Sequence, residues 1–386
     1  MKRLLAPALL ALSLFTTTFA VNLQTPLYGV YAANSGVGAT AITIAFAAYV
    51  AGLMPTLLLL GGLSDRIGRR VPVALALLLG VAATALLVVK PGWASLVLAR
   101  ALLGIGTGLA TTAGTAYMTD LLGAGQTRLA TLIVTSATSL GFGGGALATS
   151  ASLAVQGPTL APASFLALFG AAPLLALAAL GLPRADTPQR VSLLRFPVFP
   201  AGTWEFGVAL ALAWATTGMT IAVVPLALQA QGRGSWTGLV VFLAIFIGFL
   251  CQPLARRMGN AGALAWGFVL VPLGFLILIA GAWAGSIGLV LAGTCITSAA
   301  SYGFTYLAAL TEFAVRAPAN QARATAGLFV YAYVGFSLPV IASGALADRF
   351  GVLPAMAIFS AFQVGATALT VVLWRRRASL PLASPA

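Results

Sequence analysis

The sequence contains no histidine, only two cysteines and only six acidic residues among its 386 residues. Without histidine there is no Ser-His or Cys-His pair for nucleophilic catalysis and no His/Cys cluster for a metal ion. Cys251 and Cys295 both lie within apolar runs, where a free cysteine is usually a small buried hydrophobic residue. We therefore expect no enzyme, no metal and no organic cofactor.

Charge of either sign is scarce. Only 7% of the residues are charged, whereas 60% are hydrophobic and the mean hydropathy is +1.04. A soluble domain averages about 45–50% apolar and about 25% charged residues, so the lipid bilayer must be the solvent here. The apolar runs are continuous and lack the alternation of strands, and only helices or closed barrels can cross hydrocarbon. The composition therefore predicts an all-α membrane protein.

Twelve apolar runs are long enough to cross a membrane, for which about 20 residues are needed. We expect transmembrane helices at 5–30, 40–62, 72–90, 94–119, 129–152, 162–182, 202–226, 237–254, 262–283, 286–311, 324–345 and 352–374. The connection "PRADTPQRVSLLRFPVFPAG" (183–202) is rich in proline and arginine. It predicts a six-helix bundle at 1–182, a central cytoplasmic loop at 183–201, and a second six-helix bundle with a short basic tail at 202–386.

The net charge of +14 comes from basic residues in short loops, so we expect no nucleic-acid partner. With the N-terminus inside, the inner side holds Lys2, Arg3, Arg66, Arg69, Arg70, Arg128, Arg184, Arg190, Arg195, Arg256, Arg257, Arg316, Arg323, Arg375, Arg376 and Arg377. The outer side then holds only Lys90, Arg233 and Arg349. Because Lys and Arg gather in cytoplasmic loops, we expect both termini in the cytoplasm. We also expect a monomer, located in the cell (inner) membrane.

The N-terminal stretch "MKRLLAPALLALSLFTTTFA" resembles a secretory signal, with a basic start and an apolar run. Its apolarity continues through "VNLQTPLYGVYA", however, with only scattered polar residues. We therefore favour an uncleaved first helix over a cleaved signal peptide.

Short sequence motifs of the first half of the chain recur in the second half at a nearly constant offset. "GLSDRIG" (62–68) aligns with "PLARRMG" (253–259) 191 residues later, and "YMTD" (117–120) aligns with "ALTE" (309–312) 192 residues later. "TPLYGVYA" in the first run recurs loosely as "VPLALQAQ" in the seventh. Such a repeat predicts two pseudo-symmetric bundles related by an axis normal to the membrane.

The stretch "GGLSDRIGRR" (61–70) places four charges between two apolar runs. Its pattern Gly-x-Leu-Ser-Asp-Arg-x-Gly-Arg-Arg, after the second span, resembles the signature loop between helices 2 and 3 of the major facilitator superfamily. The span count, the central loop and the repeat extend this resemblance over the whole chain. The resemblance implies the major facilitator fold and a secondary transporter that moves a small-molecule substrate by alternating access.

The resemblance also implies that this loop is part of a conformational latch at the cytoplasmic side, which opens during transport. The residues assigned to it are Gly61, Asp65, Arg66, Gly68, Arg69, Arg70 and Asp120. Gly61 lets the end of helix 2 approach a neighbouring helix closely. Gly68 allows a positive φ in a very short loop.

The latch hypothesis depends on the expected partners of two acidic residues, Asp65 and Asp120. Asp65 would face the positive N-terminal end of helix 11, near Arg323–Gly327. Arg69 would pair with Asp120 at the cytoplasmic end of helix 4. The simpler alternative is that these arginines only set the topology, which leaves Asp65 unexplained. In the second half Arg256 stands where Asp65 does, so we expect that half to have lost the latch.

Arg100 lies about six residues into span 4, within "LARALLGIGTGL". An arginine at membrane depth is costly and usually faces a cavity or a partner. An arginine followed by spaced glycines, here at 104, 106 and 108, resembles the helix-4 pattern associated with proton-coupled exporters of the family. The alternative is that Arg100 snorkels toward the outer surface. Span 5 departs from the antiporter pattern, because "SLGFGGGALA" (139–148) has a glycine cluster but no Gly-Pro step.

Polar residues at helical spacing outline a substrate cavity between spans 1, 4, 7 and 10, which line the central site in the family. They are Asn22, Gln24, Thr25, Tyr28, Thr107, Thr111, Trp214, Thr217, Thr220, Thr294, Ser298, Ser301 and Tyr302. Hydroxyl side chains also form hydrogen bonds between helices. A purely structural role is therefore the alternative for each.

Of the acidic residues only Glu205 lies within a span, about three residues into span 7. Proton-coupled exporters of cationic drugs usually place a carboxylate near the midplane. We therefore expect a proton-linked exporter of a neutral or anionic small organic compound, with Arg100 and Glu205 as coupling or substrate residues. Protons would move through Glu205 or the Asp65–Asp120 cluster. The alternatives are an importer or uniporter of a sugar or metabolite, and a membrane enzyme or non-transporting receptor on the same fold.

Overall fold

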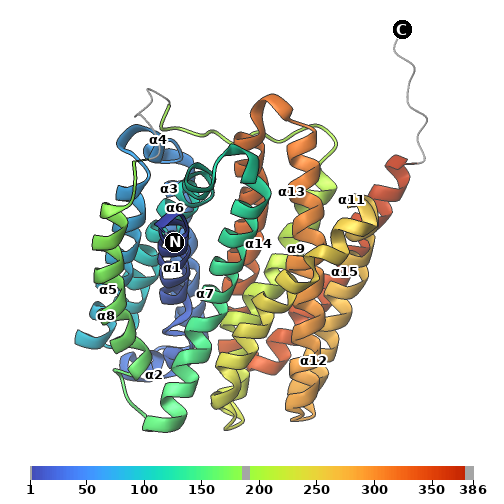
Figure 1. Cartoon of the computed structure of the whole chain (residues 1–386). Helices are drawn as coiled ribbons and strands as arrows, with labels where there is room; N and C mark the ends of the chain where they lie inside the picture. The colour runs from blue at the N-terminus through green and yellow to red at the C-terminus, as the bar shows by residue number, and fades with distance from the viewer. Residues whose placement is uncertain (1, 185–191, 379–386) are drawn as a thin grey trace.

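Figure 1 shows a computed structural model of the chain, which describes residues 2–184 and 192–378. Over these residues the protein is helical, with turns and short extended connections and no strand. Long helices stand side by side because their apolar side chains face lipid or each other, and helices satisfy their backbone groups internally. Part of the predicted central loop, 185–191, lies outside the described residues.

The first half consists of ten helical elements. They are α1 (Lys2–Asn22), η1 (Thr25–Leu27), α2 (Tyr28–Ser35), α3 (Ala39–Leu59), α4 (Leu63–Ile67), α5 (Arg70–Val89), α6 (Trp93–Leu122), η2 (Ala124–Gln126), α7 (Thr127–Gln156) and α8 (Ala163–Gly181). The second half consists of α9 (Trp204–Ala222), α10 (Val224–Ala230), η3 (Gly234–Trp236), α11 (Thr237–Trp283), α12 (Ile287–Ser298), η4 (Ala299–Thr305), α13 (Tyr306–Val315), η5 (Pro318–Asn320), α14 (Gln321–Phe350) and α15 (Val352–Ala378).

Eleven stretches of the described chain are long and apolar enough to cross a membrane. One of them, Gly234–Trp283, covers both predicted spans 237–254 and 262–283. Within it α11 leaves helical geometry at Gly259, where φ is 70° and ψ is 162°. Because a positive φ suits only glycine well, the chain turns there without a loop. Counting the two arms of α11 separately gives the twelve predicted spans.

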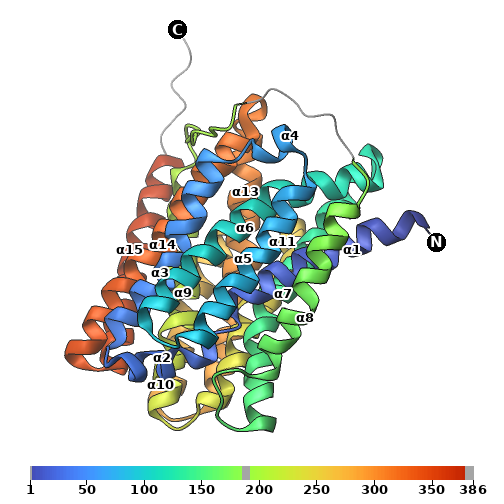
Figure 2. The ribbon, with the colours of Figure 1, turned by 90° about the vertical axis from the view of Figure 1, so that its left-hand side faces the viewer.

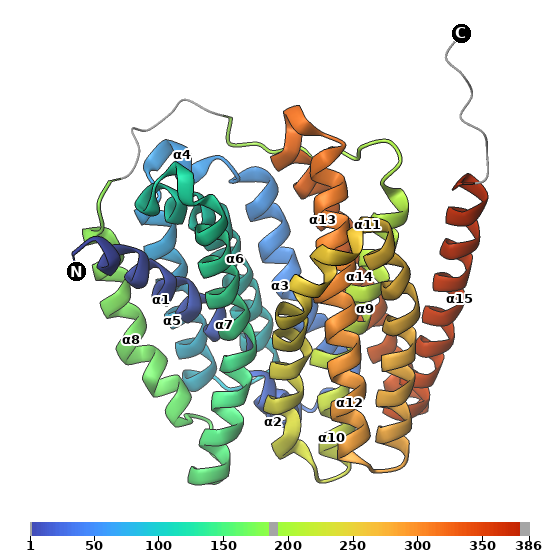
Figure 3. The ribbon, with the colours of Figure 1, turned by 45° about the vertical axis from the view of Figure 1, so that its right-hand side comes forward.

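The two halves lie next to each other, blue to green and yellow to red in Figure 3. We call the end that carries α4, Arg69 and Arg195 the basic end, and the end that carries α2 and α10 the opposite end. Figure 2 shows α4 at the top and α2 and α10 at the bottom of the molecule. The predicted fold class, two pseudo-symmetric six-helix bundles, is confirmed.

Spans 1 and 7 are both interrupted near the opposite end, at the positions related by the sequence repeat. The first span breaks after Asn22, and η1 and α2 follow, with Pro26 inside η1. The seventh breaks after Ala222, and α10 follows, with Pro225 in its first turn. Proline lacks a backbone N–H and clashes with the preceding turn, so it ends a helix or starts the next one. The predicted single helix at 5–30 was therefore wrong in this detail.

The glycine cluster of span 5 is a packing surface, since α7 runs without interruption through it. A Cβ atom on Gly145 would meet the Phe19 carbonyl oxygen at 2.0 Å, so α1 packs directly on this helix. A Cβ atom on Gly143 would meet Phe242 of α11 at 2.9 Å, which brings the two halves together. Small residues give such close approach between membrane helices. Without a proline, α7 stays uninterrupted, and its glycines pack against α1 on one side and against α11 on another.

Adding one methyl group at these glycines tests that packing. Gly145→Ala forces the added methyl against a backbone oxygen, whereas Gly144→Ala meets no atom closer than 3.7 Å. Overpacking costs about 1–3 kcal/mol, so we expect Gly145→Ala to lower the melting temperature of the detergent-purified protein. Gly144→Ala should leave it unchanged. Equal melting temperatures for the two variants would contradict the assignment.

Candidate functional site

Arg100 is the most deeply buried charged side chain of the first half, with 1% of its surface exposed. Its Nη1 donates to the Val21 carbonyl oxygen of α1 at 2.8 Å, and its Nη2 donates to the Phe46 carbonyl oxygen of α3 at 3.3 Å. The guanidinium carbon lies 5.0 Å from the Phe46 ring centroid and 4.8 Å from that of Tyr49. Arg100 therefore joins three helices inside the bundle. It does not snorkel to the surface.

The positive charge of Arg100 has no acidic partner among the described residues, because its contacts are two backbone carbonyls and two aromatic rings. Its Nε also lacks a hydrogen-bond partner. Carbonyl dipoles and ring faces stabilise a cation, but less completely than a carboxylate does. In a medium of low dielectric constant this leaves a site that favours negative charge.

Tyr49 connects Arg100 to the second half. Its side chain hydrogen-bonds Thr107 of α6, and it lies close enough to Tyr302 and Tyr333 to interact with their phenol groups. Phe46 beside it contacts Phe336 of α14, with ring centroids 4.9 Å apart. Arg100 therefore lies one side chain away from the interface between the halves.

On the second half an aromatic cluster faces this region, centred on Trp214 of α9. Five rings surround Trp214 at centroid distances of 5.1–6.3 Å; they belong to Tyr302, Tyr306, Phe329, Tyr333 and Phe336. The Trp214 indole N–H is buried without a hydrogen-bond partner. The cluster offers flat apolar faces and one free donor, which suits a planar organic molecule.

The sequence predicted Trp214 and Tyr302 as residues that line the substrate cavity. It did not predict the other aromatic residues of this region, which are Tyr49, Tyr306, Phe329, Tyr333 and Phe336. A signal was present in the second half. Tyr302 and Tyr306 are four residues apart, and Phe329, Tyr333 and Phe336 are spaced by four and three. Residues at that spacing share one helix face.

The hydroxyl residues predicted to line the cavity are mostly engaged in structural hydrogen bonds. Thr107, Thr217, Thr220 and Thr294 each donate to a carbonyl of their own helix one turn earlier. Ser301 donates to the Ala213 carbonyl of α9, and Ser298 accepts from the Gly248 N–H of α11. Thr111 is exposed. Their role in substrate binding stays a prediction.

The four cavity residues predicted in span 1 do not line one common cavity. Asn22 donates to the Phe142 carbonyl of α7 at 2.8 Å, and Gln24 donates to Val21 of its own segment at 2.8 Å. Thr25 and Tyr28 line a separate pocket at the opposite end of the molecule. The break at η1 explains the difference, because it turns the chain away from the direction of α1.

At the basic end the signature loop forms the short helix α4, and Gly68 follows it with a φ of 88°. Arg69 Nε lies 2.7 Å from Asp120 Oδ2, so the loop is tied to the end of α6. Arg70 donates to the Leu180 carbonyl at 3.0 Å, and Arg66 is exposed. These partners belong to the first half. The Arg69–Asp120 pair therefore ties the loop to α6 within the first half.

Asp65 does not lie against the start of α14 in this conformation. Its carboxylate contacts Arg195 of the central connection at 3.3 Å and Arg69 at 3.9 Å. A Cβ atom on Gly61 would meet the Arg195 side chain at 2.6 Å, so Gly61 makes room for this connection instead of a neighbouring helix. The latch role of the loop stays a prediction.

The central connection bridges the halves at the basic end. Arg195 N–H donates to the Leu58 carbonyl of α3 at 2.7 Å, and Val198 N–H donates to the Arg323 carbonyl of α14 at 3.0 Å. Arg323 Nε in turn donates to the Phe196 carbonyl at 3.0 Å. Among the described residues, Asp65 therefore reaches α14 through this connection.

The second copy of the loop retains more of the first than its sequence suggests. Gly259 has a φ of 70°, like Gly68 in the first half. Asn260 Nδ2 donates to Glu312 Oε2 at 2.9 Å, and these positions are the counterparts of Arg69 and Asp120. A hydrogen bond therefore stands where the first half has an ion pair, and the expectation that this half has lost the latch stays a prediction.

At the opposite end Asp348 of α14 caps a helix of the other half. Its Oδ1 accepts from the Ala39 N–H at 2.6 Å, and its Oδ2 accepts from the Thr40 N–H at 2.9 Å, at the start of α3. These N–H groups have no partner within the helix and carry its positive dipole end. A Cβ atom on Gly38 would meet Asp348 Oδ1 at 2.3 Å. Asp348 therefore joins the two halves at the opposite end.

Glu205 lies in the first turn of α9, close to the basic end, and is 3% exposed. It is thus a buried carboxylate at the edge of the membrane. No group of three or more Asp, Glu or Cys side chains within the described residues has the spacing of a metal site.

These features define the class of protein: a multi-pass helical membrane protein of two similar halves that meet around a buried arginine and an aromatic cluster. The family described as Major Facilitator Superfamily matches residues 10–338. The chain belongs to the major facilitator superfamily. No curated protein matches it.

Solved structures show the same fold. The chain is similar to a crystal structure of the nucleoside transporter NupG, with a TM-score of 0.76 at 14% identity over 95% of this chain and 99% of that chain. It is also similar to a bacterial homologue of the human lysosomal transporter Spinster, in an inward-facing, unoccupied conformation. The TM-score there is 0.71 at 15% identity, over 96% of this chain and 95% of that chain. An occupied, inward-facing structure of that homologue gives a TM-score of 0.71 at 14% identity, over 95% of this chain and 96% of that chain.

The matched pairs Arg69–Asp120 and Asn260–Glu312 allow a test within one molecule. An ion pair of this kind is worth about 1 kcal/mol, a factor of about five. We expect Asp120→Asn to speed amide hydrogen exchange in residues 61–70 by about that factor. The swap of Arg69→Asp with Asp120→Arg should restore part of the protection.

Glu312→Gln is the control, because it should affect exchange around residues 255–262 and leave residues 61–70 unchanged. Unaltered exchange at 61–70 in Asp120→Asn would show that the pair does not hold the loop.

Proposed function

We propose that the protein is a secondary transporter that exports a small neutral or anionic organic compound by alternating access, with the basic end in the cytoplasm. The observation that carries this proposal is Arg100, a buried cation without an acidic partner, next to an aromatic cluster on the other half. A substrate held between them contacts both halves. Its binding energy can then favour one arrangement of the halves over the other.

The charge of the substrate follows from the surroundings of Arg100. An anionic group would supply the counter-charge that the described contacts of Arg100 lack. A neutral compound would stack on the rings around Trp214 and accept a hydrogen bond from its indole N–H. The rings alone also attract cations, but the guanidinium beside Tyr49 opposes a second positive charge.

Proton coupling is the second part of the proposal. Glu205 is a buried carboxylate in the second half, and Asp65 and Asp120 both contact Arg69 in the first. A buried carboxylate can bind and release protons as its exposure to water changes. The described carboxylates lie toward the ends of the helices, so the route would run along the edges of the bundle.

Uptake into everted vesicles with an imposed pH gradient tests the proposal. The panel contains fluorescein as an anion, uridine and glucose as neutral compounds, and ethidium as a permanent cation. We expect saturable, gradient-dependent uptake of an anionic or neutral member. Arg100→Ala should lower it at least about tenfold, since a charged hydrogen bond is worth roughly 1.5–3 kcal/mol.

Arg100→Lys is the matched variant, because it keeps the charge but loses the planar fork that reaches two carbonyls. We expect it to retain only a small part of the flux. Ethidium export that survives Glu205→Gln, or normal flux in Arg100→Ala, would overturn the proposal. Flux of a sugar or nucleoside only in right-side-out vesicles would assign the importer alternative instead.

A further inference from the structure

A pocket lies at the opposite end of the molecule, between the broken spans 1 and 7. Its volume is about 430 Å³, within the range of about 300–1,000 Å³ typical of ligand sites. The first half contributes η1, α2, the end of α7 and the connection before α8, and the second half contributes α10, η3 and the start of α11. Gln229 and Ser235 at its rim are exposed, so the pocket opens to the surroundings there.

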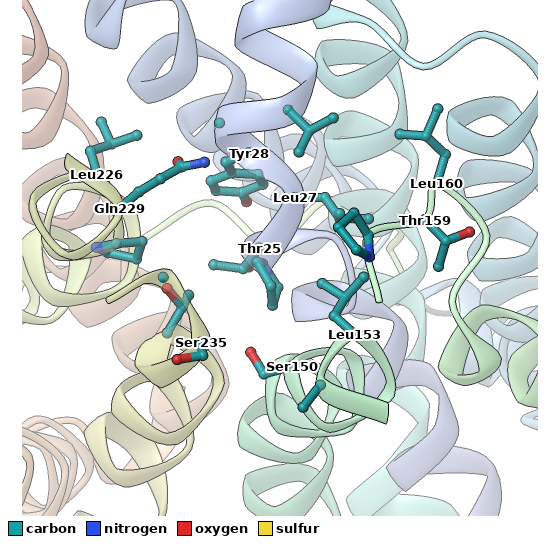
Figure 4. A pocket seen from close by; sticks show the side chains of 18 residues that line it. Thr25, Leu27, Tyr28, Ser150, Leu153, Thr159, Leu160, Leu226, Gln229 and Ser235 are labelled. Carbon is teal, nitrogen blue, oxygen red and sulfur yellow. The ribbon is translucent and has the colours of Figure 1, made fainter. Parts of the chain in front are cut away.

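Two residues that line the pocket, Thr25 and Tyr28, carry buried hydroxyl groups without partners. Thr25 and Tyr28 are each 1% exposed, and neither Thr25 Oγ1 nor the Tyr28 hydroxyl has a hydrogen-bond partner. Figure 4 shows both side chains at the centre of the pocket, between Gln229 and Ser235 on one side and Leu153 on the other. A buried polar group without a partner costs about 1–3 kcal/mol. A ligand that accepts hydrogen bonds from both groups would recover that energy.

The remaining lining decides the chemical class of the ligand. None of the 18 described residues around the pocket is charged. Leu27, Leu153, Leu160 and Leu226 supply apolar walls. An ion would find no counter-charge here, whereas an uncharged molecule with an apolar body and an acceptor group would satisfy both kinds of lining.

We propose that this pocket is a binding site, separate from Arg100, for an uncharged amphipathic molecule that accepts hydrogen bonds from Tyr28 and Thr25. Both halves form its walls while the opposite end is closed, as at Ser150, whose Oγ accepts from the Gly238 N–H at 3.0 Å. The ligand therefore binds this conformation best and stabilises it. Its effect on flux rests on the proposed transport function, but its binding does not.

Benzophenone is the probe, because it is an uncharged ketone with two apolar rings that attaches to nearby C–H bonds under ultraviolet light. The full-length protein in lipid nanodiscs is labelled over a range of concentrations, and the attachment sites are mapped by mass spectrometry. Tyr28→Phe and Thr25→Val each remove one hydroxyl. Tyr31→Phe is the matched control, since Tyr31 is 0% exposed and its hydroxyl lacks a partner, yet it does not line the pocket.

We expect saturable attachment near Leu153, Leu160 or Leu226. It should fall about fivefold in Tyr28→Phe and in Thr25→Val, as one hydrogen bond of about 1 kcal/mol implies, and stay unchanged in Tyr31→Phe. The anion 4-benzoylbenzoate should label these segments more weakly than benzophenone. Benzophenone should also slow flux in the vesicle assay.

Attachment that never saturates, or that is equal in Tyr28→Phe and in the unmodified protein, would overturn the proposal. Labelling needs neither a transported substrate nor a gradient. The labelling experiment therefore tests the binding site even if the transport proposal fails.

Discussion

Hydrocarbon cannot solvate a charge or an unpaired backbone group, and this constraint decides where the polar contacts of the protein lie. The ion pairs between described residues stand at the basic end, on Asp65, Asp120 and Glu312. Asp348 accepts its hydrogen bonds at the opposite end. Arg100 is the exception inside the bundle. Among the described residues it is stabilised by carbonyl oxygens and rings, so the proposed anionic or neutral substrate has most to contribute there.

Two kinds of contact follow from the same constraint. Within each half, close helix packing at glycines such as Gly145 keeps the helices together. A hydrogen bond between a turn and a neighbouring helix, such as Asn260–Glu312 in the second half, has the same effect. Between the halves, the direct hydrogen bonds described lie at the opposite end, at Asp348 and at Gly238, whereas Phe46 and Gly143 make apolar contacts with the second half. At the basic end the central connection lies between the halves. Such a division suits two rigid bodies that can pivot about their interface.

The sequence predicted the features that depend on composition and periodicity. Helices, span count, repeat and the positive φ at Gly68 all follow from local rules for apolar runs and glycine. It did not predict that Asp348 caps α3, because the two are 309 residues apart and the capping residue normally precedes its own helix. The breaks in spans 1 and 7 were foreseeable from Pro26 and Pro225. The aromatic cluster required tertiary packing to bring α9, α13 and α14 together.

In the proposed transport cycle the halves move relative to each other, and Asp348 holds the opposite end closed in this conformation. Spin labels in a background without Cys251 and Cys295 measure this directly. Val155 and Trp283, 87% and 60% exposed, report on the opposite end, and the exposed residues Gln126 and Asn320 report on the basic end. In Asp348→Ala we expect the first distance to lengthen and the second to shorten relative to the unmodified protein. Two unchanged distances, or two that change in the same direction, would contradict the account.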